Sequence, residues 1–208
     1  SHNDVIIQVV YPLVAGVAAL LLTGAIHGVT VAFERANTRD AFARFGAEQV
    51  APFAQRIHTQ DLTVPESLLQ PLREMGVFGL SIPEVFGGSA TGQTRDKALM
   101  VAVTEVLSEA SLAAAGSLIT RPEILARALL AGGTPEQQTC WLPRIASGEL
   151  LCAISITEPD FGSDVAGLRL TATRVPGGWR VPGAKGWCTF PGKGHVYMGG
   201  ARPHRDPR

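Results

Sequence analysis

The sequence has 208 residues, enough for one or two cores of ordinary size, and its 18 Lys and Arg residues balance its 18 Asp and Glu residues. With no net charge and a pI near 6.9, the protein lacks the basic field that attracts nucleic acid, which argues against a nucleic-acid partner. Cys140, Cys152 and Cys188 form no C-x-x-C pair and are odd in number, which argues against a disulfide framework or a metal site and favours a reducing, cytoplasmic location.

The N-terminal segment, residues 1–36, is strongly apolar. Between residues 5 and 33 there is no Asp, Glu, Lys or Arg, and a bilayer-spanning helix needs about 20 predominantly apolar residues. Gly24 and Gly28 have the spacing of small residues in packed membrane helices, and Arg35 follows the run on what would be its cytoplasmic side. Ala, Gly and Thr dilute the run, however, and a buried or oligomer-facing helix has the same composition. We expect a buried or interfacial helix, with a membrane anchor as the alternative.

Residues 37–149 have helical spacing throughout. An apolar series covers residues 42–57, and Pro52 is expected to bend this first helix because it lacks an N–H group. Thr63 and Glu66 have the spacing of a capping box in front of a second helix, which Gly76 ends.

Three more helices are predicted in this region. They cover residues 96–109, about 122–133, and a final helix that begins after Thr134, has Gln137 in capping-box position and ends at Gly148. The inner stripe of the first of these three helices is predicted to consist of Leu99, Met100, Val103, Val106 and Leu107.

After Gly148 the apolar period changes from helix to strand. Strands are predicted at residues 151–156, 168–175 and 179–181, and Pro-Gly-Gly at 176–178 is a hairpin signal. The fold class is therefore α+β, with a helical bundle followed by a partial antiparallel β domain. The predicted domains are residues 1–36, 37–149 and 150–208.

Two blocks in the strand region carry residues suited to a flavin. The first, Ile154 to Asp164, ends in a loop whose hydroxyls and open backbone N–H groups are donors for a diphosphate or a ring edge. The second, Gly183 to Thr189, contains Trp187 with its flat apolar face. If this block is a strand, Thr189 projects to the same side as Trp187. A hairpin with an ordinary turn and a core Trp is the simpler interpretation of the same residues.

Together the blocks resemble the flavin-binding signature of the acyl-CoA dehydrogenases. Residues from about 37 to 190 resemble the N-terminal helical domain and first middle-domain strands of that family, and Gly76 to Glu84 and Gly133 to Glu149 support the resemblance. Within the family, Ile57-His58, residues 117–123 and Trp187-Cys188-Thr189-Phe190 are similar to the methylsuccinyl-CoA dehydrogenases of the ethylmalonyl-CoA pathway.

The resemblance implies an FAD-dependent enzyme that oxidises an acyl-CoA substrate at its α and β carbons. A glutamate base removes the α proton, the β carbon passes hydride to flavin N5, and the electrons leave through an electron-transferring flavoprotein. The full-length enzyme is expected to be a homo-oligomer.

By matched positions, the resemblance implies a role for each of several residues. Ile156 and Thr157 contact the flavin pyrimidine edge, Ser163 its diphosphate or the CoA chain, Trp187 the ring and Thr189 the N5 region. Two further residues have a structural interpretation as an alternative to a binding role. Ile154 belongs to the same cofactor-binding stretch or to the core, and Arg121 contacts a substrate carboxylate or is a surface arginine.

The sequence also departs from the family pattern. Pro182 stands where the family has Asn, Gly186 replaces a larger residue, and residues 202–208 have no strand character. No carboxylate matches the catalytic glutamate, and Glu158 is interpreted as a structural charge at a strand end. We therefore expect this chain to be C-terminally truncated, without a catalytic residue of its own, and inactive. A non-catalytic, membrane-attached remnant and an acyl-CoA oxidase are the alternative functions.

Overall fold

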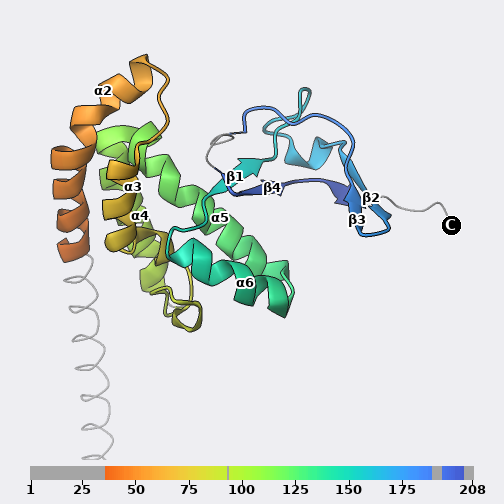
Figure 1. Ribbon diagram of the computed structural model, residues 1–208, viewed down its shortest axis with the longest axis horizontal. Helices are drawn as coiled ribbons and strands as arrows, with labels where there is room; N and C mark the ends of the chain where they lie inside the picture. Colours follow the sequence, from red (N-terminus) through yellow and green to blue (C-terminus); the bar gives the residue numbers. More distant parts are fainter. Residues whose placement is uncertain (1–35, 93, 189–193, 204–208) are drawn as a thin grey trace, which may run out of the picture.

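The computed structural model describes residues 36–92, 94–188 and 194–203. Figure 1 shows a helical body from which a strand-rich part projects, in agreement with the α+β class. The apolar segment at residues 5–33, for which a membrane anchor was one alternative, lies outside the described residues. Within the described ranges, no helix has both the length and the apolar character that a membrane crossing requires.

The first described helix contains a widened turn where a bend was predicted. Residues 36–45 are α-helical, Gly46–Val50 form a π-helical turn, and α2 follows at Ala51–Thr59 with Pro52 in its first turn. Pro52 is tolerated there because the first N–H groups of a helix have no intrahelical acceptor. Gly46 allows close packing on α4 (Thr94–Ser111), since a Cβ at this position would lie 3.0 Å from the Cβ of Ala110.

The capping box predicted at Thr63 and Glu66 is wrong. Helix α3 spans Glu66–Glu74, its N-cap is Pro65, and no side chain caps it. The Glu66 carboxylate forms an ion pair with Arg73 on the same helix and therefore does not reach back to the chain before it.

Helices α4 and α5 are joined by a second π-helical turn. α4 spans Thr94–Ser111, the turn spans Leu112–Gly116, and α5 spans Ser117–Gly132. The fourth predicted helix thus begins at Ser117, well before Pro122, which is buried inside the helix. Of the predicted stripe on α4, Met100, Val103, Val106 and Leu107 are buried and Leu99 packs against them.

The last helix, α6 (Pro135–Ala146), has the capping box that its sequence predicts. The Gln137 amide donates to the Thr134 hydroxyl at 3.3 Å, and the Thr134 amide donates to Gln137 Oε1 at 2.9 Å. Pro135 occupies the first helical position, where its missing N–H costs nothing.

Five short strands follow in the described part of the chain, and their pairing is mixed rather than purely antiparallel. β2 (Thr171–Val175) and β3 (Gly178–Arg180) form the predicted hairpin, with Gly177 at φ +84° in its turn. β1 (Cys152–Ser155) instead pairs in parallel with β4 (Val196–Gly199), and β2 pairs in parallel with β5 (Arg202–Pro203). The expectation that residues 202–208 lack strand character is wrong for Arg202–Pro203, because β2 supplies a partner edge.

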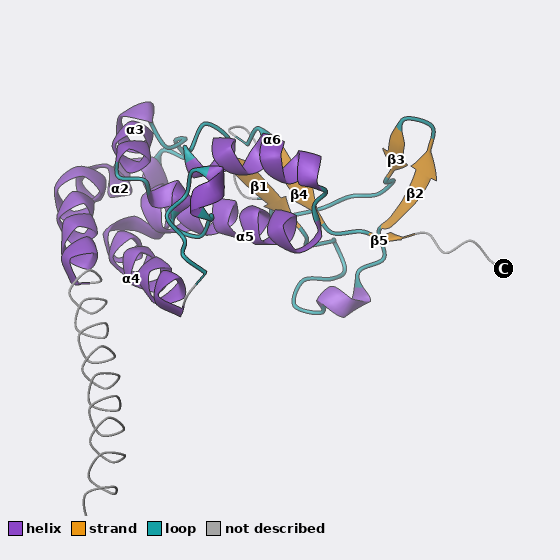
Figure 2. Cartoon of the chain, turned by 90° about the horizontal axis from the view of Figure 1, so that it is seen from below, coloured by secondary structure: helices purple, strands orange, loops and turns teal. Residues whose placement is uncertain are grey.

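Two apolar cores lie in the helical body. The first joins the helices from residue 42 to residue 119, and the second lies between α5, α6 and the β1–β4 pair (Figure 2). β1 contributes Cys152 to the second core, and β4 turns Val196 and Met198 toward it. The second core therefore fixes the strand pair on the helical body, and β1 leads directly into the predicted flavin block.

Candidate functional site

The first block ends in a tight turn that follows β1. Glu158 and Phe161 exchange two backbone hydrogen bonds, of 2.9 and 3.2 Å, so the chain reverses over Pro159 and Asp160. Asp164 caps the short 3-10 helix that follows by accepting from the Gly167 amide at 3.0 Å, and the Arg169 guanidinium lies 4.8 Å from the centre of the Phe161 ring. The loop from residue 158 to residue 170 is thus held by its own polar contacts.

Glu158 is the one buried charged residue among those described, with 7% of its side chain exposed. Its Oε2 accepts from the Arg169 amide at 2.7 Å, and its Oε1 accepts from the Leu170 amide at 2.9 Å. The hydrogen bond from the Arg169 amide lowers the pKa of Glu158 from 4.5 to about 2, although burial opposes this. The Leu170 amide and the Lys185 ammonium make smaller contributions in the same direction. The carboxylate is therefore ionised and structural, as the sequence predicted, and not poised to take a proton.

Lys185 joins the second block to the first. Its Nζ donates to Glu158 Oε1 at 3.0 Å and to the Ile156 carbonyl at 2.7 Å, and its side chain is 11% exposed. The Gly186 amide donates to the Thr157 carbonyl at 2.9 Å. Three contacts thus bring the two blocks side by side, although Glu158 and Lys185 are 27 residues apart in the sequence.

Trp187 follows directly and is the most exposed large apolar side chain described, at 91%. Its backbone is left-handed, with φ +54°, which a non-glycine residue rarely adopts. Residues 184–188 are not a strand, so the strand geometry predicted for Trp187 is wrong. Thr189 itself lies outside the described residues.

Two hydroxyl groups of this region are available to bind a polar ligand. Thr157 is half-buried beside the Lys185 contact and Ser163 is exposed, and neither hydroxyl bonds to another described residue. The amides of Gly162 and Ser163 also donate no hydrogen bond within the described ranges. Trp187 offers a flat apolar face, and its neighbour Gly186 is bonded to the Thr157 carbonyl. Free donors and an exposed aromatic face on two joined blocks fit the edge, phosphates and ring of a flavin nucleotide.

The remaining predicted residues have different surroundings. Ile154 is in β1 and packs against the second core, as its alternative interpretation states, while Ile156 lies at the end of the strand and presents its carbonyl to Lys185. Arg121 is within α5, and its side chain is not described. Sequence reasoning did not assign a role to Lys185, although a lysine between Gly183 and Gly186 was part of the motif. That Lys185 pairs with Glu158 cannot be inferred without the fold.

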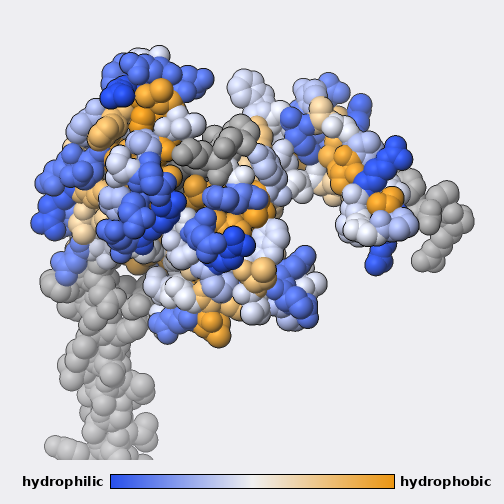
Figure 3. Space-filling model, viewed as in Figure 1, coloured by the Kyte–Doolittle hydropathy of each residue, from blue (hydrophilic) through white to orange (hydrophobic). Residues whose placement is uncertain are grey.

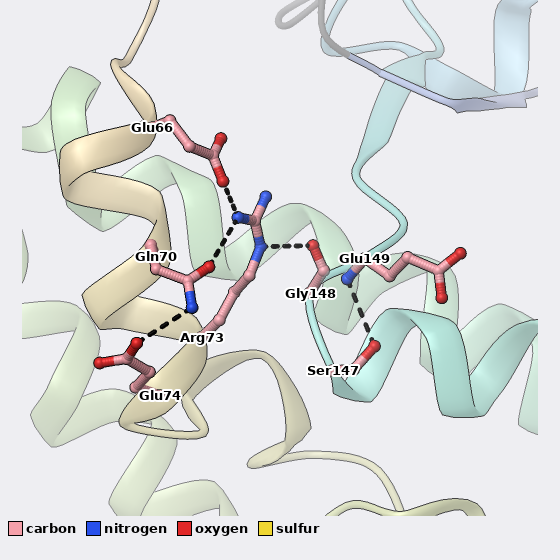
Figure 4. A network of polar contacts seen from close by, with 7 residues as sticks. All are labelled: Glu66, Gln70, Arg73, Glu74, Ser147, Gly148 and Glu149. Carbon is pink, nitrogen blue, oxygen red and sulfur yellow. Dashed lines mark hydrogen bonds and ion pairs between the residues drawn. The ribbon is translucent and has the colours of Figure 1, made fainter.

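A polar network fixes the connection that leads into β1 (Figure 4). Arg73 on α3 pairs with Glu66, and its Nε donates to the Gly148 carbonyl at 3.0 Å. Gly148 has φ +71°, and a Cβ there would clash with the Phe78 ring. The turn after α6 is therefore held against α3, and β1 leaves the helical body in a defined direction.

The strand-rich part presents apolar side chains to solvent. Figure 3 shows hydrophobic residues at the surface of this part, across an open recess from the helical body. The large apolar side chains exposed here include Trp187 at 91%, Trp179 at 61% and Val165 at 56%. An exposed apolar surface beside free donors is typical of a ligand site or an interface.

Comparisons with known proteins agree with this geometry. The family pattern described as "Acyl-CoA dehydrogenase, N-terminal domain" matches residues 34–149. The chain is 46% identical over 158 residues to (2S)-methylsuccinyl-CoA dehydrogenase of Cereibacter sphaeroides, covering 76% of this chain and 28% of that protein. It is 32% identical over 152 residues to a mitochondrial 2-methylacyl-CoA dehydrogenase of Solanum tuberosum, covering 73% of this chain and 36% of that one.

A solved structure has the same arrangement of elements. The glutaryl-coenzyme A dehydrogenase glutaryl-CoA complex superposes with a TM-score of 0.72 at 28% identity, covering 80% of this chain and 42% of that one. The chain thus spans less than half the length of each of these three proteins.

Proposed function

The chain belongs to the acyl-CoA dehydrogenase family, and from this premise we propose that it forms the flavin-facing part of an FAD-dependent enzyme that oxidises an acyl-CoA thioester. The observation that carries the proposal is the meeting of the two blocks through Lys185 and Gly186, one of which carries the free hydroxyls of Thr157 and Ser163 and the other the exposed Trp187. The chemistry that FAD supplies when bound is acceptance of the two electrons released at the α and β carbons.

This chain's residues would bind and orient the cofactor and exclude water from it. Thr157 and the neighbouring Ile156 would hold the pyrimidine edge, Ser163 and the open amides of its loop the diphosphate, and Trp187 would cover the ring. Oxidation also requires a base within hydrogen-bond reach of the α proton. Glu158 does not supply it, because its carboxylate is occupied by two amides and Lys185. We assign the base to none of the described residues.

We further propose that the substrate is the thioester of a short branched or dicarboxylic acid, such as 2-methylsuccinyl-CoA. The 46% identity to a methylsuccinyl-CoA dehydrogenase, against 32% to a 2-methylacyl-CoA dehydrogenase, supports a substrate that keeps a free carboxylate. Arg121 would pair with that carboxylate. The proposed electron acceptor is an electron-transferring flavoprotein, and the proposed location is the cytoplasm.

A chimera tests the proposal. The matching segment of the Cereibacter sphaeroides enzyme is replaced by that of this chain, and bound FAD and dye reduction by 2-methylsuccinyl-CoA are measured. We expect about one FAD per subunit and turnover, whereas Trp187→Ala should lose flavin. A folded chimera that retains FAD without Trp187 would contradict the assigned site. The 208-residue chain, tested as it stands, should retain little FAD and reduce no dye, because its described residues form one side of the site.

The substrate class has its own test in the same chimera. Arg121→Met should raise KM for 2-methylsuccinyl-CoA by about tenfold or more and leave KM for isovaleryl-CoA nearly unchanged, because only the former offers a carboxylate to pair. Equal effects on both substrates would remove Arg121 from the substrate site.

A further inference from the structure

The conformation of Trp187 requires a cause that its own packing does not provide. Its indole is 91% exposed, so contacts of the side chain do not hold the backbone at φ +54°. Left-handed backbone costs a non-glycine residue free energy, and such a conformation persists where the surrounding structure determines it. Among the described residues, the contacts that can determine it lie in the chain just before Trp187.

Those contacts are made by Lys185 and Gly186. The Gly186 amide is fixed on the Thr157 carbonyl at 2.9 Å, and Lys185 Nζ reaches the Ile156 carbonyl at 2.7 Å and Glu158 at 3.0 Å. Because the chain is anchored at two successive residues, by the Lys185 side chain and by the Gly186 backbone, the direction in which it enters Trp187 is set. Gly183, at φ +136°, allows the loop to lie on Leu170, where a Cβ would clash with the leucine side chain.

Glu158 extends the same anchorage to a third segment. Besides Lys185 it accepts from the amides of Arg169 and Leu170, at the entrance to β2. One buried carboxylate therefore connects the turn after β1, the start of β2 and the loop before Trp187. Few apolar contacts are available to do this, since Leu168 is the single buried apolar side chain described between residues 156 and 203.

We propose that Glu158 and Lys185 form a buried clamp that positions the flavin-facing surface, by fixing Trp187 in its left-handed conformation relative to Thr157 and the loop at Ser163. They are positioning residues and touch no cofactor or substrate atom in this assignment. The role of the clamp toward a flavin rests on the proposed function, whereas its effect on the loop is independent of it.

The charge state and burial of the pair support this role. With side chains 7% and 11% exposed, the two charges are shielded from water, and removal of one leaves the other buried without its partner. Glu158→Gln would also present an NH2 group to one of two amide donors, so it cannot reproduce the carboxylate contacts. An exposed pair between α6 and the segment before β1, Arg144 with Glu149 at 2.8 Å, provides the matched control because its side chains are 48% and 60% exposed.

The experiment measures amide hydrogen exchange in the 208-residue chain at pH 7. Lys185→Met and Glu158→Gln should each speed exchange in peptides covering residues 183–188 and 169–170 by about tenfold or more, without a change in α6. Arg144→Met and Glu149→Gln should leave exchange at residues 183–188 and 169–170 unchanged. Lys185→Arg should keep part of the protection that Lys185→Met loses. Unchanged exchange at Gly186 in Lys185→Met, or equal loss across α6, would overturn the clamp.

A second measurement separates the clamp from the proposed function. FAD affinity is measured in the chimera, where Lys185→Met should weaken binding by about tenfold. If the loop loosens in the first experiment but the chimera without further substitutions binds no FAD, the proposed function fails and the clamp stands. If the unsubstituted chimera binds FAD and Lys185→Met binds it equally well, the positioning role fails.

Discussion

Residues 36–153 place their apolar side chains in two continuous cores, whereas the described residues between 156 and 203 bury one apolar side chain, Leu168, and one charged side chain, Glu158. The helical body therefore depends on the hydrophobic effect, and the strand-rich part depends on hydrogen bonds and a buried ion pair. The proposed site lies in the second region. Its shape is then sensitive to single polar substitutions that the helical body would tolerate.

The largest expected effect is in the helical cores. Leu107→Ala and Leu142→Ala should each lower the free energy of unfolding by about 2–5 kcal/mol, because both side chains are fully buried and leave cavities. Val175→Ala on β2, where 37% of the side chain is exposed, should cost less than about 1 kcal/mol. Urea unfolding followed by far-ultraviolet circular dichroism measures all three. Similar losses for Val175 and Leu142 would show that the strand-rich part has a core of its own.

Acid should loosen the strand-rich part through Glu158. Its folded pKa of about 2 lies below the ordinary 4.5, so the carboxylate contributes stability that is complete above pH 4.5 and is lost between pH 4.5 and about 2. Hydrogen exchange of residues 169–170 and 183–188 across this window checks the prediction. In Lys185→Met the pKa of Glu158 should be higher, so protection should be lost nearer pH 4.5. An identical pH profile in the unsubstituted chain and in Lys185→Met would contradict the contribution of Lys185.

The capping residues of two helices provide a smaller, paired test within the helical body. Thr134→Ala should cost about 1 kcal/mol of unfolding free energy, because it removes the acceptor for the Gln137 amide. Thr63→Ala should cost almost nothing, since α3 is capped by no side chain. Thermal unfolding of both variants distinguishes them, and equal losses would restore the capping box that the sequence predicted at Thr63.

The smallest effect is expected at Trp187. Trp187→Gly should stabilise the loop by less than about 1 kcal/mol relative to Trp187→Ala, because glycine adopts φ +54° without a Cβ penalty but has greater freedom when unfolded. Exchange rates of the Gly186 amide in the two variants measure the difference. Slower exchange in the alanine variant would show that Trp187 is not strained.

Apart from the capping box at Thr63, the sequence predicted local features well, and it predicted long-range features poorly. The capping box at Thr134, the buried stripe of α4 and the Pro-Gly turn between β2 and β3 depend on neighbouring residues, and all three are confirmed. The two π-helical turns and the parallel partners of β1 and β2 depend on packing between distant segments, which periodicity does not contain. Similarly, the motif contained both Glu158 and Lys185, but only the fold reveals that they pair.

The most direct test of the central claim, that the buried pair acts on the flavin surface through Trp187, is a double-mutant cycle of FAD affinity in the chimera. Kd is measured for the unsubstituted protein, Lys185→Met, Trp187→Ala and the double variant. If Lys185 acts by positioning Trp187, the double variant should bind FAD about as weakly as Trp187→Ala alone, because there is no indole left to position. Losses that simply add would contradict the account.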